Sequence, residues 1–218
     1  MKKIIIAIPR GRIIEECQNI LNKTTFAPDP LLFDEYSRNL TFSSKDENIN
    51  YIKVRSFDVC TFVAFGAAQI GIAGEDVIQE FNYSEVYAPL NLNIGHCKLS
   101  VAALTSLLEK ENPDTWSNIR IATKYPNISK EFFAKKGIQV ETIKLNGSME
   151  LAPSLKMCRR IVDLVSTGKT LKENGLTEVE EIMKVQSKLI VNRSSFKTNT
   201  ETIQNIIEEL KNIISSSY

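Results

Sequence analysis

The 218-residue chain has little of several features that mark particular classes of protein. It contains one histidine, His96, so a multi-histidine metal site is excluded and a Ser-His-Asp triad would have to use this residue. Because no aspartate or serine motif accompanies His96, we interpret it as structural or solvated rather than catalytic. The four cysteines are widely spaced and form no CxxC pair, which favours reduced thiols over a disulfide framework or a zinc site.

Long apolar runs and an excess of one charge are absent too. No run approaches the ~20 apolar residues of a membrane span, and only a few apolar residues precede Pro9 and Arg10, unlike a secretory signal. Lys and Arg number 27 against 26 for Asp and Glu, so no overall field favours a nucleic-acid or membrane partner. We expect a globular, cytoplasmic protein whose anion sites are local.

Strand-like and helix-like segments alternate along the chain. Residues 3–8 form a short apolar run closed by Pro9 and Gly11, which is typical of a strand buried on both faces of a parallel sheet. Apolar residues at helical spacing follow from Ile13 to Leu21. Further strands are expected at residues 51–54, 69–74, 98–103, 119–123, 138–145, 161–165 and 189–191, mostly with helices between them.

Local signals also predict where helices begin and end. Ser56 and Ser129 have the hydroxyl side chain of an N-cap, and each precedes a helical pattern. A helix is expected from Ser148 to about Arg160, and an apolar stripe from Ile203 to Ile214 predicts a C-terminal amphipathic helix.

The alternation of strands and helices predicts an α/β fold with two lobes and a cleft between them. No low-complexity linker interrupts the series, and we place the lobes at residues 1–92 plus about 185–218, and at about 93–184. Residues 22–50 are less periodic and suggest a hairpin or excursion that carries Arg38. Ligands commonly bind in a cleft of this kind.

The strongest local signal for chemistry lies at Asp163–Thr170. An acidic residue at a strand end is followed there by a hydroxyl- and glycine-rich loop that enters a helix. Backbone N–H groups in such a loop can hold a phosphate, and a nearby carboxylate suits sugar hydroxyls. The end of the loop imitates a Walker A motif, but Asp163 stands where that motif needs glycine. An ordinary strand-turn-helix connection would explain the same residues.

Arginines supply the second signal. Arg10 and Arg12 flank Gly11 at a helix N-terminus, where guanidinium groups can bind phosphate bidentately and glycine lets a ligand approach the backbone. A solvated pair of arginines explains the pattern equally well. Arg38 and Arg55 either reach the same cleft or lie at the surface.

Two glycines in the strand at residues 69–74 have two explanations. Gly71 and Gly74 serve either tight packing and a turn or the close approach of a flat ligand such as a purine. Glu75 and Asp76 follow and open the next helix, where carboxylates suit the helix dipole.

Seven segments form an ordered set that extends over nearly the whole chain. They are residues 7–12, 54–59, 66–77, 122–127, 147–153, 161–171 and 173–176. In this order they resemble the short form of the ATP phosphoribosyltransferases of histidine biosynthesis. Several ordered matches are far more specific than any one loop.

The resemblance implies a fold similar to that of two-lobed, type II periplasmic binding proteins. It also implies transfer of the phosphoribosyl group of phosphoribosyl pyrophosphate to N1 of ATP, with release of pyrophosphate and with Mg²⁺ carried by the substrates. Residues 93–184 would bind phosphoribosyl pyrophosphate, and the other lobe the nucleotide. The ribose hydroxyls and the 5′-phosphate would be held by Glu150, Asp163, Ser166, Thr167, Gly168, Lys169 and Thr170.

On the nucleotide side the resemblance assigns the remaining residues. ATP would contact Arg10, Gly11, Arg12, Gly71, Gly74, Glu75 and Asp76, while Arg38 and Arg55 would have a catalytic role. Departure of pyrophosphate builds charge on both fragments, which arginines and Mg²⁺ stabilise. The bond-forming step needs no general base, in agreement with a chain that has one histidine.

The chain departs from the family pattern at a few positions. Lysine is usual where Arg10 stands, and small residues are usual where Lys156 and Cys158 stand. The chain ends soon after Ser215, so we expect no C-terminal regulatory domain. The resemblance implies instead a separate regulatory subunit similar to histidyl-tRNA synthetase, which forms a hetero-oligomer with homodimers of the catalytic chain.

Two other functions remain open from the residues alone. A non-catalytic small-molecule binding protein shares the expected two-lobed fold, but it has no need of the loop at Asp163–Thr170. A P-loop kinase or NTPase is weakened by Asp163 and by the lack of an early Walker loop.

Overall fold

The computed structural model describes residues 3–11 and 13–216, and the chain divides into two compact units. Unit 1 comprises Met1–Gly95 and Gln186–Tyr218, and unit 2 comprises His96–Val185. The boundary was expected at residue 92, and the first segment of unit 1 ends at Gly95. The Leu92 N–H donates to the Ser187 carbonyl at 3.0 Å and the Ser187 N–H to the Ile94 carbonyl at 2.8 Å, so this segment is paired within unit 1.

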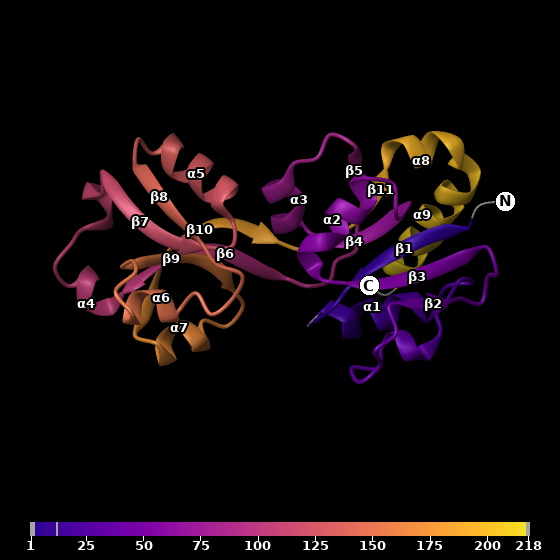
Figure 1. The fold of residues 1–218 in the computed structure, drawn as a ribbon, viewed down its shortest axis with the longest axis horizontal. Coiled ribbons are helices and arrows are strands. Elements are labelled where there is room, and N and C mark those ends of the chain that lie inside the picture. Colours follow the sequence, from indigo (N-terminus) through magenta and orange to yellow (C-terminus); the bar gives the residue numbers. More distant parts are fainter. Residues whose placement is uncertain (1–2, 12, 217–218) are drawn as a thin grey trace. The chain divides into compact units, whose positions relative to one another are not determined.

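Unit 1 contains a six-stranded mixed sheet with the strand order β2-β3-β1-β4-β11-β5 (Figure 1). Strands β3, β1 and β4 are parallel, whereas β2, β11 and β5 are each antiparallel to the strand that they join. The elements are β1 (Ile4–Pro9), α1 (Ile13–Leu21), η1 (Pro30–Leu32), β2 (Thr41–Ser43), β3 (Ile49–Val54), α2 (Ser56–Ala64), β4 (Ile70–Gly74), α3 (Glu75–Phe81), β5 (Val86–Asn91), β11 (Ser187–Asn192), α8 (Arg193–Thr198) and α9 (Thr200–Ser215).

The two faces of β1 explain its continuous apolar sequence. Ile4, Ile6 and Ile8 belong to a core that includes residues of α1 and α9. Ala7 belongs to a second core that includes Val59 of α2. Because side chains alternate between the faces of a strand, helices on both faces require apolar residues at every position. The prediction of a buried strand with parallel neighbours is confirmed.

Unit 2 contains a five-stranded mixed sheet with the order β10-β6-β9-β7-β8. Strands β9, β7 and β8 are parallel, whereas β6 is antiparallel to both β9 and β10. The elements are β6 (Cys97–Leu104), α4 (Thr105–Leu108), η2 (Pro113–Thr115), β7 (Asn118–Thr123), α5 (Pro126–Lys135), β8 (Gln139–Lys144), α6 (Leu151–Ser154), β9 (Arg160–Val165), α7 (Lys169–Glu173) and β10 (Leu176–Val185).

Three predictions about helices were wrong. Only Leu151–Ser154 is helical in the segment expected from Ser148 to Arg160, because both Ser148 and Lys156 have positive φ and interrupt the helical backbone. Ser56 is the first residue of α2 rather than its N-cap, which is Arg55. Ser129 lies inside α5, where its hydroxyl donates to the Tyr125 carbonyl at 2.7 Å.

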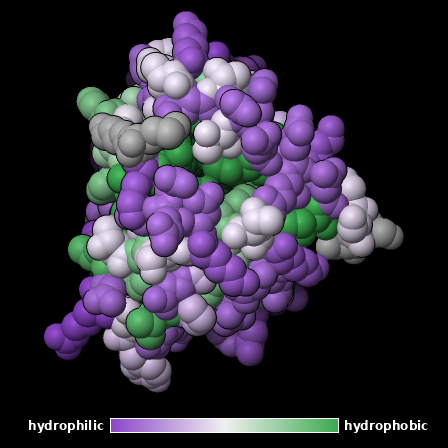
Figure 2. Space-filling model, turned by 90° about the vertical axis from the view of Figure 1, so that its right-hand side faces the viewer, coloured by the Kyte–Doolittle hydropathy of each residue, from purple (hydrophilic) through white to green (hydrophobic). Residues whose placement is uncertain are grey.

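The surface and the interior differ as the sequence pattern predicts. Hydrophilic residues cover most of the face drawn in Figure 2, and apolar residues show only in separate areas between them. All four cysteines are free thiols, three of them buried. In residues 3–11 and 13–216, no helix has both the length and the apolar character that crossing a membrane would require.

Candidate active site

The carboxyl ends of β1 and β3 place two of the predicted arginines on neighbouring strands. Pro9 pairs with Val54 in the parallel register, and Arg10 and Arg55 are the next residues of the two strands. The Arg10 N–H continues the pairing by donating to the Val54 carbonyl at 2.8 Å. Both arginine side chains are exposed, so they are available to an anionic ligand.

The backbone around these arginines is fixed by a glycine and a hydroxyl group. Gly11 has a φ of 103°, a conformation that side-chain-bearing residues rarely adopt. The Ser56 hydroxyl donates to the Arg10 carbonyl at 3.3 Å and ties the start of α2 to the turn after β1. Arg12, the other arginine of the predicted pair, lies outside the described residues.

Lys53 is a residue of this region that the sequence reasoning missed. The residue is only 7% exposed, and its Nζ donates to the Asp34 carbonyl at 2.9 Å. Its backbone N–H donates to the Leu40 carbonyl, also at 2.9 Å. Lys53 therefore holds both ends of the loop that carries the exposed Arg38.

The charge of Lys53 adds to the positive field beside Arg10. Burial and, next, the charge of Arg10 lower the pKa of the Lys53 ammonium. Asp34 and Glu35 act in the opposite direction. A signal was present in the sequence, because Lys53 shares the inward-facing alternation of Ile49 and Tyr51 on β3.

The glycines of β4 both have a packing explanation. A Cβ atom on Gly71 would lie 2.7 Å from Val59 Cγ1 and 2.9 Å from Val63 Cγ2, because α2 packs closely on the strand. A Cβ atom on Gly74 would lie 2.1 Å from Asp76 Oδ1. Their assignment to ATP binding stays a prediction.

The acidic residues after β4 are held within unit 1. Glu75 forms an ion pair of 2.7 Å with Lys188 of the neighbouring strand β11. Asp76 is 4% exposed. Burial of Cys60 and, to a smaller extent, the negative charge of Asp76 raise the pKa of the Cys60 thiol to about 12.

In unit 2, the loop predicted to hold a phosphate follows β9. Gly168 has a φ of 73° and is the N-cap residue of α7. The Lys169 N–H donates to the Thr167 hydroxyl at 3.4 Å, and the Leu164 N–H donates to Asp163 Oδ1 at 2.8 Å. Ser166, Thr167, Lys169 and Thr170 are exposed. The loop thus presents three hydroxyl groups and an ammonium group to solvent, next to a carboxylate.

Residues on either side of Glu150 and of the loop belong to one hydrophobic core cluster. Met149 and Ala152, on either side of the half-buried Glu150, are each 1% exposed. The same cluster contains Val165 and Leu171, which flank the loop. This packing brings the turn that carries Glu150 and the loop after β9 to one part of unit 2, as the proposed binding of a single ligand requires.

The carboxylates suit a magnesium ion that arrives with phosphates. Among the described residues, no group of three or more His, Cys, Asp or Glu side chains could hold a metal ion. Mg²⁺ is commonly bound through one or two carboxylates together with substrate phosphates and water. Asp163 and Glu150 offer oxygen ligands of this kind, and Mg²⁺ carried by the substrates stays a prediction.

The fold identifies the structural class to which the protein belongs. The alkanesulfonate-binding protein SsuA from Xanthomonas axonopodis pv. citri aligns with 98% of this chain and 73% of its own chain at a TM-score of 0.60, with 8% identity. At that identity the likeness shows the fold alone. The chain has the two-lobed α/β fold of type II periplasmic binding proteins, which confirms the predicted fold class.

The family follows from closer relatives. The family model of HisG, ATP phosphoribosyltransferase, matches residues 55–212. The ATP phosphoribosyltransferase of Rhodospirillum rubrum is 54% identical over 209 residues, covering 96% of this chain and 92% of the relative. That of Citrifermentans bemidjiense is 49% identical over 208 residues, covering 95% and 97%. The chain belongs to the HisG family of ATP phosphoribosyltransferases.

A solved structure of the same family agrees with this assignment. The ATP phosphoribosyl transferase (HisG:HisZ) complex from Thermotoga maritima contains a chain that is 31% identical, with a TM-score of 0.81 and coverage of 98% and 99%. The protein is a pentosyltransferase that joins the phosphoribosyl group to N1 of ATP, the first step of histidine biosynthesis. The function predicted from the ordered motifs is confirmed.

The close contact between Gly71 and α2 predicts that a side chain added at Gly71 destabilises the protein, whether or not a ligand is bound. The Gly71→Ala variant should be less stable by about 1–3 kcal/mol, because its methyl group overlaps the two valines. Gly147→Ala is the matched control, since a Cβ atom there meets nothing within 4 Å, and it should change stability by less than about 0.5 kcal/mol. Urea unfolding measures both; equal stability of Gly71→Ala and the parent would contradict the packing role.

Proposed function

We propose that the turns after β1 and β3 bind the phosphates of ATP and pyrophosphate, and that the loop after β9 binds the ribose 5-phosphate group. The observation that carries the proposal is the presence, after parallel strands in each unit, of groups that suit phosphates. These are the exposed Arg10 and Arg55 in unit 1 and the hydroxyl-rich loop beside Asp163 in unit 2.

Arg55 and Arg38 act on the leaving group. In the reaction the bond from C1 of the ribose to pyrophosphate oxygen breaks and pyrophosphate keeps the electron pair, while N1 of the adenine donates a pair to C1. Negative charge therefore grows on pyrophosphate as the bond breaks. Guanidinium groups stabilise that charge more in the transition state than in the ground state, which raises the rate. Lys53 positions Arg38 through the Asp34 and Leu40 carbonyls.

The loop of unit 2 orients the group that is transferred. The 5′-phosphate accepts hydrogen bonds from Ser166, Thr167 and Thr170, with Lys169 and the Gly168 backbone completing the site. Asp163 and Glu150 accept hydrogen bonds from the ribose hydroxyls. Fixing the sugar at both ends presents C1 to the incoming nitrogen, and such orientation contributes a large share of the rate in group transfer.

ATP lies on unit 1 in this proposal. Arg10, Gly11 and Arg12 bind its triphosphate. Gly71, Gly74, Glu75 and Asp76, at the carboxyl end of β4 and the start of α3, line the nucleotide side. Mg²⁺ bound to the phosphates supplies additional positive charge when it is present.

The transferase works in the cytoplasm with a regulatory partner in this proposal. The Thermotoga maritima neighbour was solved as a HisG:HisZ complex, and the two chains match over nearly their full lengths. We extend this assembly to the present chain, as a hetero-oligomer with a HisZ-like subunit similar to histidyl-tRNA synthetase. Histidine would then control the enzyme through that subunit.

Substitutions at the two turns should impair catalysis and leave the fold intact. Arg55→Ala should lower kcat by about 100-fold or more, because a charge-stabilising donor is lost. Asp163→Asn should raise the KM for phosphoribosyl pyrophosphate by roughly tenfold, because a hydrogen bond to a charged group is weakened. The assay contains Mg²⁺, ATP, phosphoribosyl pyrophosphate and pyrophosphatase, and follows the N1-substituted adenine nucleotide by absorbance and mass.

Matched controls separate these effects from general damage. Arg193→Ala and Asp114→Asn change an exposed arginine and an exposed aspartate elsewhere, and both should keep the parent kinetics. Unchanged activity in Arg55→Ala or Asp163→Asn would remove that residue from the proposed site. Absence of product from the parent chain, even with a HisZ-like partner added, would contradict the proposed assignment of substrates.

The proposed partner predicts the composition of the native enzyme. A tagged chain expressed in its own cells should co-purify with a second chain similar to histidyl-tRNA synthetase, and histidine should inhibit the assembly but not the isolated catalytic chain. Size-exclusion chromatography with mass measurement and an inhibition curve test both points. Recovery of homodimers alone, with full sensitivity to histidine, would contradict the partner.

A further inference from the structure

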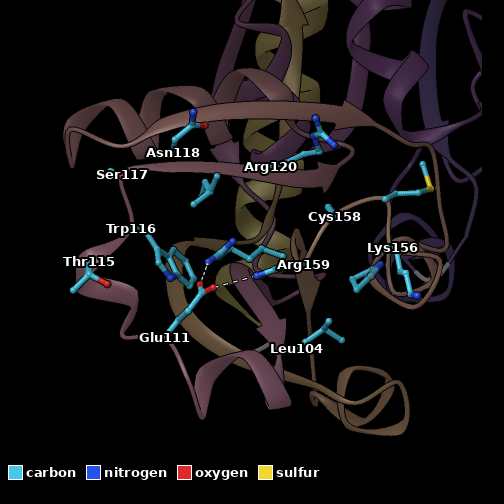
Figure 3. Close-up of a pocket in the computed structure, with 14 residues that line it drawn as sticks. Leu104, Glu111, Thr115, Trp116, Ser117, Asn118, Arg120, Lys156, Cys158 and Arg159 are labelled. Carbon is cyan, nitrogen blue, oxygen red and sulfur yellow. Dashed lines mark hydrogen bonds and ion pairs between the residues drawn. The ribbon is translucent and has the colours of Figure 1, made fainter.

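A pocket lies in unit 2 at the end of the sheet opposite to the loop after β9 (Figure 3). It has a volume of about 690 Å³, within the range of small-molecule sites. It adjoins the start of β9 at Arg160, whereas the loop follows the end of this strand at Val165. At ~3.3 Å per residue these positions are about 16 Å apart, so the pocket is separate from the loop after β9.

Positive charge dominates the lining of this pocket. Of the charged side chains that line it, four are cationic and one is a carboxylate; they are Arg120, Lys156, Arg159, Arg160 and Glu111. Arg120 forms an ion pair of 2.7 Å with Glu141, which is not a lining residue. Lys156 and Arg159 are exposed. The local field therefore favours an anion, although the whole chain has a formal charge of only +1.

Arg160 is the buried part of the site. The residue is 7% exposed, and its guanidinium carbon lies 4.1 Å from the centroid of the Trp116 ring. Its Nη2 contacts Glu111 Oε2, and Arg159 Nη1 lies 3.3 Å from Glu111 Oε1. In Figure 3 the Glu111 carboxylate lies beside the Trp116 ring, with dashed lines to the two guanidinium groups. One carboxylate thus forms ion pairs with two guanidinium groups.

Two N–H donors at this place lack an acceptor. Arg160 Nε and Trp116 Nε1 are buried, and neither has a hydrogen-bond partner among the residues that the structure describes. Buried donors are nearly always paired in folded proteins, because leaving them unpaired costs free energy. Burial also lowers the pKa of the Arg160 guanidinium, which Glu111 opposes. Within the described residues, the Glu111 carboxylate therefore leaves polar groups of Arg160 and Trp116 unsatisfied beside the pocket.

We propose that this pocket, the Trp116 pocket, binds a small organic phosphate, with its phosphate oxygens on Arg159 and Arg160 and its carbon part on the apolar lining. A phosphate has more acceptor sites than a carboxylate, and guanidinium forks bind it bidentately. Leu104, Met157 and Trp116 supply the apolar surface. Binding displaces Glu111 from the two guanidinium groups.

Trp116 is the only tryptophan of the chain, so its fluorescence reports the pocket directly. The experiment titrates the full chain with phenyl phosphate, glucose 6-phosphate, inorganic phosphate and citrate. Phenyl phosphate and glucose 6-phosphate should each give a saturable change, with inorganic phosphate binding more weakly because it lacks the carbon part. No change with either phosphate ester at millimolar concentrations, or a response to citrate alone, would overturn the proposal.

Exposed residues provide variants that preserve the core. Arg159→Gln and Lys156→Gln should each weaken binding by about tenfold, whereas Lys135→Gln, an exposed control in the same unit, should not change it. Asp163→Asn should also keep the parent affinity, which separates this site from the proposed active site. Parent affinity in both Arg159→Gln and Lys156→Gln would overturn the proposal.

Discussion

Parallel pairing of strands is the constraint on which the site in each unit depends. In unit 1, β1 lies between β3 and β4, so the chain leaves all three strands at the same edge of the sheet. The register of Pro9 with Val54 makes Arg10 and Arg55 neighbours, although 44 residues lie between them in sequence, as their numbers show. In unit 2, β7, β8 and β9 are parallel in the same way, and the loop with Asp163 follows β9. A shift in the pairing register of β1 and β3 would separate Arg10 from Arg55.

Local positive charge then makes the ends of these strands suited to anions. The chain is almost neutral overall, yet three cationic residues lie close together: Arg10 follows β1, Lys53 lies on β3 and Arg55 follows β3. Burying Lys53 costs solvation of its ammonium, and the carbonyl of Asp34 compensates by accepting its hydrogen bond. In the Trp116 pocket, the buried Arg160 guanidinium also loses solvation, and its ion pair with Glu111 compensates that loss only partly. A phosphate-binding enzyme can therefore keep a neutral composition and still present concentrated positive charge.

Sequence reasoning succeeded where one local pattern determined the structure. The apolar run of β1 and the turn at Gly168 needed no knowledge of distant residues, and the ordered motifs identified the family. It did not predict the strand β10, because register shifts beside Glu180 and Met183 break the alternation that marks a strand. It missed the Trp116 pocket, since the lining comes from segments far apart in sequence that only the sheet brings together. Roles of individual site residues stay predictions.

The central claim is that the strand ends of each unit bind the substrates. Amide signals of the isotope-labelled chain test it directly during titration with Mg²⁺ and phosphoribosyl pyrophosphate. The account predicts that the backbone N–H signals of Ser166–Thr170 shift first and saturate, because the 5′-phosphate binds there. Unchanged signals of Ser166–Thr170 at saturation, with shifts confined to other parts of unit 2, would contradict it.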